Sequence, residues 1–266
     1  MIRSDRALIL RRFAYGETSL VLHVLTPSFG RVHLLAKGAY RPTSRYYAVL
    51  DLFDTLELEW SHAAGRELDT LRAGDLARRR LAISSDLFRY RAGLAALELA
   101  GLAAQEGQPV RGLFARLEHV LDELAEARID ARLALSAFEL GFLAELGLAP
   151  ALARCAACGR VAPPAASPRA SSVFSPGAGG RLCRRCAEEA RASGRRVFAL
   201  STRTLELAAE LANDGPEALV GRISDAELEK VRAFVVRFLE YHLESRPKSY
   251  RRTVGGVAGA PGFATP

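Results

Sequence analysis

The sequence predicts an α+β protein built from several domains, and three patterns along its 266 residues support this. Residues 1–80 alternate apolar and polar side chains as short strands do. Residues 81–150 and 200–252 instead repeat apolar side chains at helical spacing. Between the helical parts, residues 151–199 hold all four cysteines of the chain. The remaining residues, 253–266, are rich in Gly, Pro and Ala and predict a disordered tail.

The first 80 residues predict five short strands separated by turn-forming residues. The clearest is DLFDTLELEW, in which Leu56, Leu58 and Trp60 alternate with two glutamates. Five strands predict a small barrel or a sandwich, and the OB-fold is the five-stranded barrel most used for nucleic acid, although the strand number alone does not single it out. The predicted strands cover residues 6–13, 18–26, 31–38, 51–60 and 67–74.

Helical signals begin at about residue 81. Ser85 or Asp86 can cap the first long helix, and Ser224 with Glu227 forms a capping box for the last. The segment 131–150 is apolar nearly all round, which is typical of a buried central helix. The predicted helices cover residues 85–104, 111–127, 131–150, 201–214 and 224–246.

The four cysteines form two CxxC pairs, Cys155 with Cys158 and Cys183 with Cys186. Two residues between cysteines let both thiolates of a pair turn onto one ion, and four thiolates complete a tetrahedral Zn²⁺ site with no position left for water. Such a closed site is structural, so one structural zinc ion is predicted here. The sequence between the pairs, 160–180, reads as a long loop.

The sequence disfavours two other uses of the cysteines. Redox CxxC pairs usually lie at a strand-to-helix turn of a thioredoxin-like βαβ unit, and that pattern is not seen around these cysteines. Structural disulfides need an oxidising compartment, and the N-terminal residues do not read as a signal peptide. No stretch approaches the ~18 apolar residues of a membrane span, so a soluble cytoplasmic protein is expected.

The charge balance favours a polyanionic partner. Lys and Arg number 37 against 30 Asp and Glu, which gives a formal net charge of +7. Nucleic acid is the first candidate and an anionic membrane the second, while a merely basic soluble protein is the plain alternative.

Cations and aromatic residues are interleaved in RVHLLAKGAYRPTSRYYAVL, residues 31–50. Single-strand binders combine cations for the backbone with rings on which bases stack. Alternatively, one or two tyrosines pack in the barrel core and the charges are merely solvated. A second basic run leaves the barrel at RAGDLARRR, and a third ends the last helix at residues 244–252. The candidate DNA-binding residues are Arg31, Lys37, Tyr40, Arg41, Arg45, Tyr46, Arg78, Arg79 and Arg80.

Signals for catalysis are weak. The five histidines are scattered, and no HExxH, GxSxG or phosphate-binding GxxxxGK[ST] motif occurs. The chain is therefore not expected to be an enzyme.

Three stretches resemble the RecO family of bacterial DNA repair and recombination proteins. They are ALILRRFAYGETSLVLHVLTPSFGRVHLLAKGAYRPTSR, FELGFLAELGLAPALARCAACG and RFLEYHLESRPKSYRR. The likeness runs in the same order from about residue 5 to 252. Tyr40 departs from it, since a small or basic residue is expected there.

The resemblance implies an N-terminal OB-fold, a helical domain and a zinc-binding segment. It also implies binding of single- and double-stranded DNA, annealing of complementary strands, and loading of RecA in the RecF pathway of repair after DNA damage. The implied partners are RecR and the acidic C-terminal tail of the single-stranded DNA-binding protein, with no membrane and a place in the nucleoid. The positions carried over are Arg31, Lys37, Arg41 and Arg45 for DNA and the four cysteines for zinc.

Two other function classes stay open. A zinc-ribbon protein can regulate by reading duplex sequence or can bind RNA, and it would not accelerate the pairing of arbitrary complementary strands. A thiol–disulfide enzyme would have dithiols that titrate freely, which a tightly held zinc ion would exclude.

Overall fold

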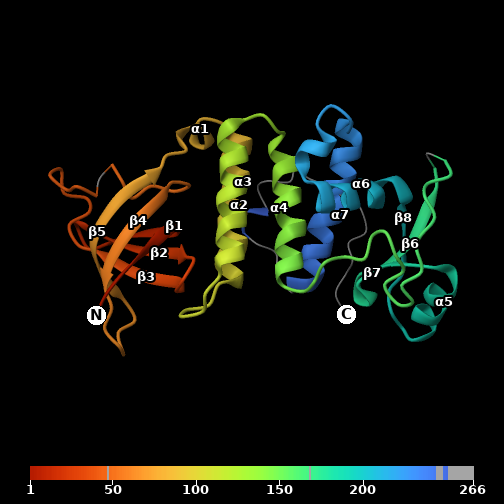
Figure 1. The fold of residues 1–266 in the computed structure, drawn as a ribbon, viewed down its shortest axis with the longest axis horizontal. Helices are drawn as coiled ribbons and strands as arrows, with labels where there is room; N and C mark the ends of the chain where they lie inside the picture. Colours follow the sequence, from red (N-terminus) through yellow and green to blue (C-terminus); the bar gives the residue numbers. More distant parts are fainter. Residues whose placement is uncertain (47, 168, 244–247, 251–266) are drawn as a thin grey trace. The chain divides into compact units, whose positions relative to one another are not determined.

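The computed structural model describes residues 1–46, 48–167, 169–243 and 248–250. The chain separates into two compact units, Met1–Arg128 and Ile129–Pro266 (Figure 1). The predicted tail at 253–266 lies outside the described residues, as do Tyr47 and most of the basic run at 244–252.

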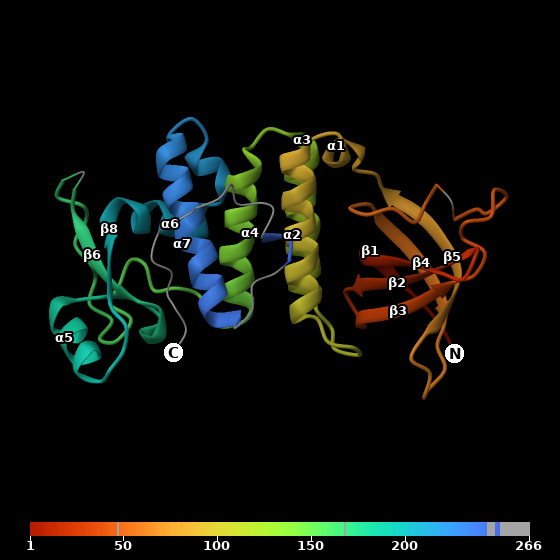
Figure 2. The ribbon, with the colours of Figure 1, turned by 180° about the vertical axis from the view of Figure 1, so that it is seen from behind.

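The first unit begins with a closed five-stranded barrel, which confirms the predicted OB-fold. Its strand order is β1-β2-β3-β5-β4, with β4 pairing back onto β1. Neighbouring strands are antiparallel except β3 and β5, which are parallel. Figure 2 shows β1, β2 and β3 side by side. The strands are β1 (Ile2–Tyr15), β2 (Ser19–Thr26), β3 (Gly30–Ala36), β4 (Thr55–Ser61) and β5 (Asp69–Arg78).

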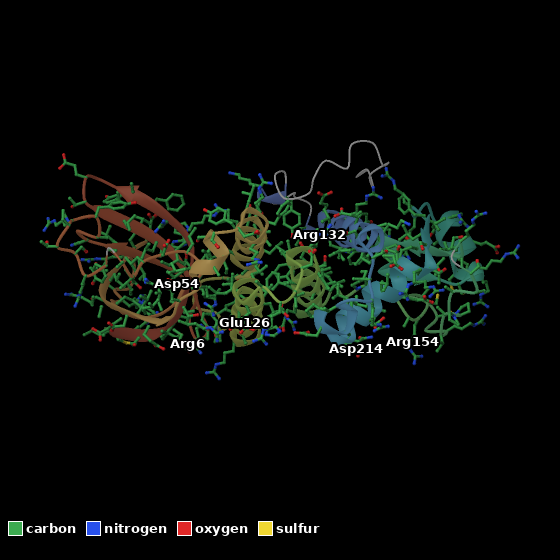
Figure 3. All side chains as sticks on the ribbon, turned by 90° about the horizontal axis from the view of Figure 1, so that it is seen from above. Arg6, Asp54, Glu126, Arg132, Arg154 and Asp214 are labelled. Carbon is green, nitrogen blue, oxygen red and sulfur yellow. The ribbon has the colours of Figure 1, made fainter. Side chains whose placement is uncertain are left out.

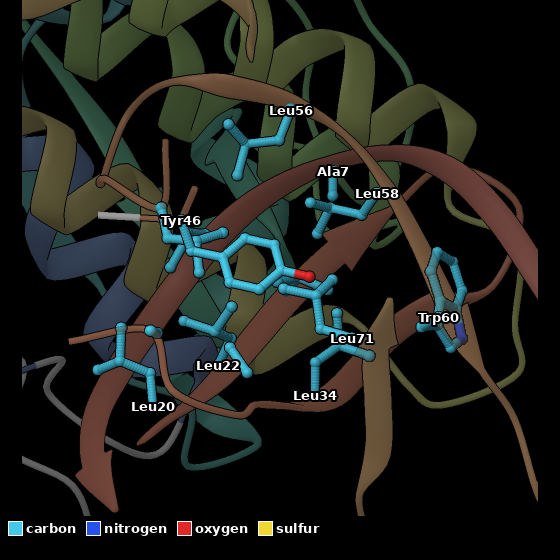
Figure 4. Packing of buried hydrophobic residues seen from close by; sticks show 14 of the residues in the cluster. Ala7, Leu20, Leu22, Leu34, Tyr46, Leu56, Leu58, Trp60 and Leu71 are labelled. Carbon is cyan, nitrogen blue, oxygen red and sulfur yellow. The ribbon is translucent and has the colours of Figure 1, made fainter. Parts of the chain in front are cut away.

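Apolar side chains at alternate positions of the strands fill the inside of the barrel. Leu56, Leu58 and Trp60 of β4 all point inward and are fully or almost fully buried, as their spacing predicts. The inner side chains of β2 and β3 meet them to form one cluster (Figure 4). The indole of Trp60 lies edge-on to Phe29, with ring centroids 5.5 Å apart. Such burial of large apolar side chains is the main stabilising term of the barrel.

Three helices complete the first unit: α1 (Leu81–Ser84), α2 (Leu87–Ala103) and α3 (Arg111–Glu126). Asp86, one of the two predicted caps, accepts a hydrogen bond from Arg89 N at 2.9 Å and starts α2. Residues 81–128 therefore belong to the compact unit of the barrel. The single helical domain expected over 81–150 and 200–252 stays a prediction.

The second unit holds the remaining predicted helices, α4 (Ala131–Glu145), α6 (Thr202–Asp214) and α7 (Asp225–Leu243). The capping box that precedes α7 is present, because Ser224 N donates to Glu227 Oε2 at 3.0 Å and Glu227 N donates to Ser224 Oγ at 3.4 Å. Two short 3₁₀ turns, η1 (Pro176–Ala178) and η2 (Pro216–Leu219), lie in this unit as well.

The long loop expected over 160–180 is wrong in its second half. A three-stranded sheet forms from β6 (Ser171–Ser175), β7 (Gly180–Leu182) and β8 (Phe198–Ser201), with β6 in the middle. Phe174 of β6 is fully buried, and its ring lies edge-on to Phe234 and Phe238 of α7 at 5.2 and 5.8 Å. One short helix, α5 (Arg184–Ala192), was also missed. The Ser, Pro and Gly residues around Phe174 are typical of a loop, so the sequence pattern did not predict the strand that carries this buried ring.

A buried ion pair joins α4 to α7. Glu139, fully buried although its helix is apolar on nearly all sides, accepts hydrogen bonds from Arg232 and from the hydroxyl of Tyr250. Burial raises the pKa of the Tyr250 phenol well above its ordinary value, and the nearby Glu139 carboxylate raises it further. Among the described residues, no helix is long and apolar enough to cross a membrane.

Candidate nucleic-acid interface and four-cysteine metal site

The four cysteine sulfurs converge on one point in the second unit. All four Sγ atoms lie within 4.8 Å of one another, and those of Cys158 and Cys183 are 3.8 Å apart. A tetrahedron with zinc–sulfur bonds of about 2.3 Å has its sulfurs about 3.8 Å apart, so the arrangement fits a four-thiolate zinc site. The cluster is a possible metal site, and zinc as its occupant stays a prediction.

Local backbone structure explains the convergence. Gly159 takes φ +70°, a left-handed turn that glycine adopts without strain, and its N–H donates to Cys155 O at 2.9 Å. Ala156 N donates to Arg181 O at 2.8 Å, which ties the first pair to β7 just before the second pair. Cys183 then precedes α5, and Cys186 lies in the first turn of that helix.

Neighbouring groups shift the pKa values of the Cys155 and Cys186 thiols in opposite directions. A hydrogen bond with Cys183 and burial raise the pKa of the Cys186 thiol to about 12. Burial opposes ionisation of Cys155, but hydrogen bonds from the backbone of Cys183 and Cys158 outweigh it and lower the pKa of that thiol to about 6. Four adjacent thiolates repel one another, so a divalent cation is what would let all four lose their protons together.

The predicted DNA-binding residues separate into three groups. Lys37, Tyr40 and Arg41 are exposed in the turns that follow β3. Tyr40 N donates to Thr18 O at 2.9 Å, which holds this loop against the β1–β2 turn. Neither Lys37 nor Arg41 has an acidic partner among the residues that the structure describes. These three side chains are therefore exposed to solvent.

Arg31, Arg45 and Tyr46 have intramolecular roles. Arg31 is half-buried, and its Nη1 donates to Gly101 O at 3.3 Å. The Arg45 guanidinium, though exposed, donates to the carbonyl of Arg72. Tyr46 is only 8% exposed, its ring lies inside the barrel (Figure 4), and its hydroxyl donates to Arg72 O at 2.8 Å. Of the two interpretations of the tyrosines, packing in the barrel core describes Tyr46 in this structure, and its contact with DNA stays a prediction.

Each arginine of the run Arg78–Arg80 has an acidic partner in the structure, and the contact of this run with DNA stays a prediction. The Arg80 side chain is 1% exposed, donating to Asp122 Oδ1 at 2.5 Å and Phe53 O at 2.8 Å, so it is a structural residue. Arg78 and Arg79 are more open, but each pairs with an acid: Arg78 with Asp122 at 2.8 Å, Arg79 with Asp54 at 3.3 Å (Asp54 is labelled in Figure 3). Burial raises the pKa of Asp54, and the Arg80 N–H that it accepts counters this.

Sequence reasoning missed two aromatic residues. Phe13 and Tyr15 lie at the end of β1 and are 47% and 56% exposed. The predicted strand ended at residue 13, so Tyr15 fell into an expected turn. The available signal was the odd-numbered alternation of large side chains in RRFAY, which continues the strand to residue 15.

The fold and site together define a class of protein: a closed OB-fold barrel with an exposed cationic loop, on a chain whose second unit carries a four-cysteine metal site. Two family models match this chain. "Recombination protein O N terminal" matches residues 1–80, and "Recombination protein O C terminal" matches residues 84–251. The chain belongs to the RecO family of DNA repair and recombination proteins.

Curated relatives agree with this assignment along nearly the whole chain. "DNA repair protein RecO" of Nocardioides sp. is 34% identical over 251 residues, covering 94% of this chain and 98% of the relative. "DNA repair protein RecO" of Anaeromyxobacter dehalogenans is 33% identical over 263 residues, covering 96% and 100%. The protein of the same name from Thermobifida fusca is 32% identical over 253 residues, covering 93% and 96%.

Proposed function

We propose that this protein is a DNA-binding recombination mediator. In this role it binds single- and double-stranded DNA, anneals complementary strands, and helps RecR to load RecA in the bacterial nucleoid. The single observation that supports it most is the loop after β3, where Lys37, Tyr40 and Arg41 are exposed on an OB-fold of a RecO-family chain. The acidic tail of the single-stranded DNA-binding protein is a further proposed partner.

Annealing by such a surface needs no bond-making chemistry. Two DNA strands repel each other through their phosphates, and each carries a condensed layer of counterions. Cationic side chains that replace those counterions lower the repulsion and gain the entropy of ion release. The strands then search for register while held together. Lys37 and Arg41 are the proposed phosphate contacts, and the rest of the barrel positions them.

The metal site has a structural part in this proposal. Cys155, Cys158, Cys183 and Cys186 would hold one zinc ion, which supplies a cross-link between the two cysteine pairs and no open coordination position. The zinc ion is thus expected to maintain the second unit, while DNA contact depends on the barrel.

Fluorescence anisotropy of labelled DNA against salt concentration tests the DNA site. The double variant Lys37→Glu, Arg41→Glu should bind DNA at least about tenfold more weakly and should flatten the slope of log K against log[salt]. A matched control with the same change of charge is the double variant Arg195→Glu, Arg196→Glu, since both arginines are exposed and neither is a candidate DNA-binding residue. An unchanged slope in the double variant would contradict the proposed site.

An annealing assay separates the proposal from a sequence-reading regulator. The wild-type protein should accelerate pairing of arbitrary complementary strands, and the double variant should not. Binding confined to one duplex sequence, without accelerated pairing, would favour the regulator.

A further inference from the structure

The four clustered cysteines differ in how far solvent reaches their side chains. Cys155 and Cys186 are buried, and both pack in one small apolar cluster with Leu182. Cys158 is exposed, and Cys183 is only partly buried. Each CxxC pair therefore joins one buried cysteine to one that a small solute can reach.

The two accessible sulfurs belong to different pairs and lie side by side. Cys158 Sγ and Cys183 Sγ are 3.8 Å apart. Because a disulfide bond is about 2.05 Å long, a relative shift of about 2 Å would join these sulfurs. Cys158 lies in a turn and Cys183 directly precedes α5, so neither residue is inside a helix or a strand. Exposure and distance together favour a bond between these two sulfurs.

A bond across the pairs would have a different effect from a bond within a pair. A Cys158–Cys183 disulfide would close the loop over residues 159–182 and would join the same two segments that a four-thiolate metal site joins. A disulfide inside one CxxC pair closes only a very short loop, and cross-links of longer loops restrict the unfolded chain more. The hydrogen bond from Ala156 N to Arg181 O, at 2.8 Å, already holds the backbones of the two segments together. The disulfide across the pairs would therefore keep the segment tied together after the loss of a metal.

We propose that Cys158 and Cys183 are a modification site for peroxides, at which they form a reversible disulfide. The Cys158 sulfur attacks one oxygen of hydrogen peroxide, so that an S–O bond forms, the O–O bond breaks and hydroxide leaves. The Cys183 sulfur then attacks the Cys158 sulfur, so that the S–S bond forms, the S–O bond breaks and a second hydroxide leaves. The two thiols supply the two protons that convert both hydroxides to water. Two thiols are oxidised to one disulfide, and one peroxide is reduced to two molecules of water.

The disulfide and a bound metal are mutually exclusive uses of these sulfurs. A closed four-thiolate site needs all four, and the disulfide would leave only Cys155 and Cys186 as thiolate ligands. Peroxide is therefore expected to release the metal, and a thiol reductant is expected to restore metal binding. The disulfide depends on the positions of the sulfurs and is separate from the proposed contact with DNA.

Tryptic peptides distinguish the possible disulfides. Cleavage after arginine places Cys155 and Cys158 together in CAACGR, Cys183 in LCR and Cys186 in CAEEAR. The full chain, loaded with zinc, is treated with hydrogen peroxide while a chromogenic chelator measures the released zinc. The remaining thiols are then alkylated, and the unreduced digest is analysed by mass spectrometry. The expected product is CAACGR linked to LCR, with one zinc ion released per chain and both changes reversed by dithiothreitol and added zinc.

A matched pair of variants identifies the sulfur of the first pair that reacts. Cys155→Ser and Cys158→Ser each remove one thiolate from the same CxxC pair, so both lower the number of metal ligands equally. After peroxide treatment, Cys155→Ser should still link its first peptide to LCR, and Cys158→Ser should not, because Cys155 is buried. The peptide map of the wild-type chain does not depend on how either variant folds.

Several results would overturn the disulfide across the pairs. A bond inside CAACGR, or one between LCR and CAEEAR, without the expected link would mean that the two pairs oxidise separately. Four alkylated cysteines after peroxide treatment would mean that the site resists this oxidant. Residues 151–199 should also keep more amide-exchange protection in the peroxide-treated chain than in the chelated, reduced chain, and equal loss in both would contradict the cross-link.

Failure of the disulfide is distinguishable from failure of the metal site and of the DNA site. If the chain binds zinc and anneals DNA but yields no linked peptides, the proposed function stands and the disulfide is wrong. If CAACGR links to LCR in a chain that binds neither zinc nor DNA, the disulfide stands and those two proposals are wrong.

Discussion

The barrel and the cysteine segment, residues 151–199, are stabilised in different ways. The barrel buries a large cluster of leucines, valines and Trp60 inside a closed sheet. The cluster around the cysteines is small, and its buried members are Cys155, Leu182, Cys186, Ala187 and Ala190. A small core of this kind rarely stabilises a fold without a cross-link or a metal. The barrel therefore depends on apolar burial, whereas the cysteine segment is expected to depend on a metal ion bound by its thiols.

Removal of the metal gives the largest expected effect and tests the comparison most directly. Structural zinc contributes about 10–16 kcal/mol of binding free energy in small zinc domains. Chelation, or Cys183→Ser, should therefore abolish amide-exchange protection in residues 151–199 and leave that of residues 1–80 unchanged. Hydrogen exchange with peptide-level mass spectrometry measures both regions in one sample.

The control for that variant is Arg184→Ser, next to Cys183, because the Arg184 side chain is 96% exposed. Protection that survives chelation in residues 151–199 would show that the segment folds by its own packing. DNA binding that is lost at full stability in Cys183→Ser would instead give the cysteines a direct part in DNA contact.

Truncation of a core side chain should destabilise the barrel and leave the cysteine segment folded. Trp60 is fully buried, so Trp60→Ala should lower the free energy of unfolding of the barrel by about 3–5 kcal/mol through lost transfer energy and a residual cavity. Urea unfolding monitored by exchange of barrel peptides measures this loss. One metal per chain should remain bound, and metal release at the same urea concentration as barrel unfolding would contradict independent stabilisation.

The smallest expected effect concerns the capping box of α7, the helix against which Phe174 packs. Ser224→Ala removes the cap and should cost about 1 kcal/mol. The pKa of Glu227 is lowered to about 2, chiefly by the hydrogen bond from Ser224 Oγ and then by its backbone N–H and Arg203. Because the folded-state pKa lies below the ordinary value of 4.5, this stabilisation is present above pH 4.5 and lost as the pH falls toward 2.

Melting temperatures of the wild type and Glu227→Gln across that pH range measure the contribution. The difference between the two proteins should shrink as the solution becomes more acidic. A constant difference would mean that the Glu227 carboxylate is not the titrating group.

Periodic elements could be predicted from the sequence, and isolated contacts could not. The strand that contains Trp60 and the helix that follows Asp86 obey strong local patterns, so their positions are confirmed to within a few residues. The convergence of the cysteines also follows from spacing alone. The sequence did not predict that Tyr46 and Arg80 are buried, because nothing local distinguishes a buried tyrosine or arginine from a solvated one. Their roles are set by partners distant in sequence, the carbonyls of Arg72 and Phe53 and the carboxylate of Asp122.

The barrel closes through a short parallel seam, in which Leu34 pairs with Asp69 and Leu35 with Thr70. The antiparallel ladders elsewhere in the barrel are longer, so this seam is the place where local opening breaks the fewest hydrogen bonds. The seam is therefore where the closed barrel is expected to open first.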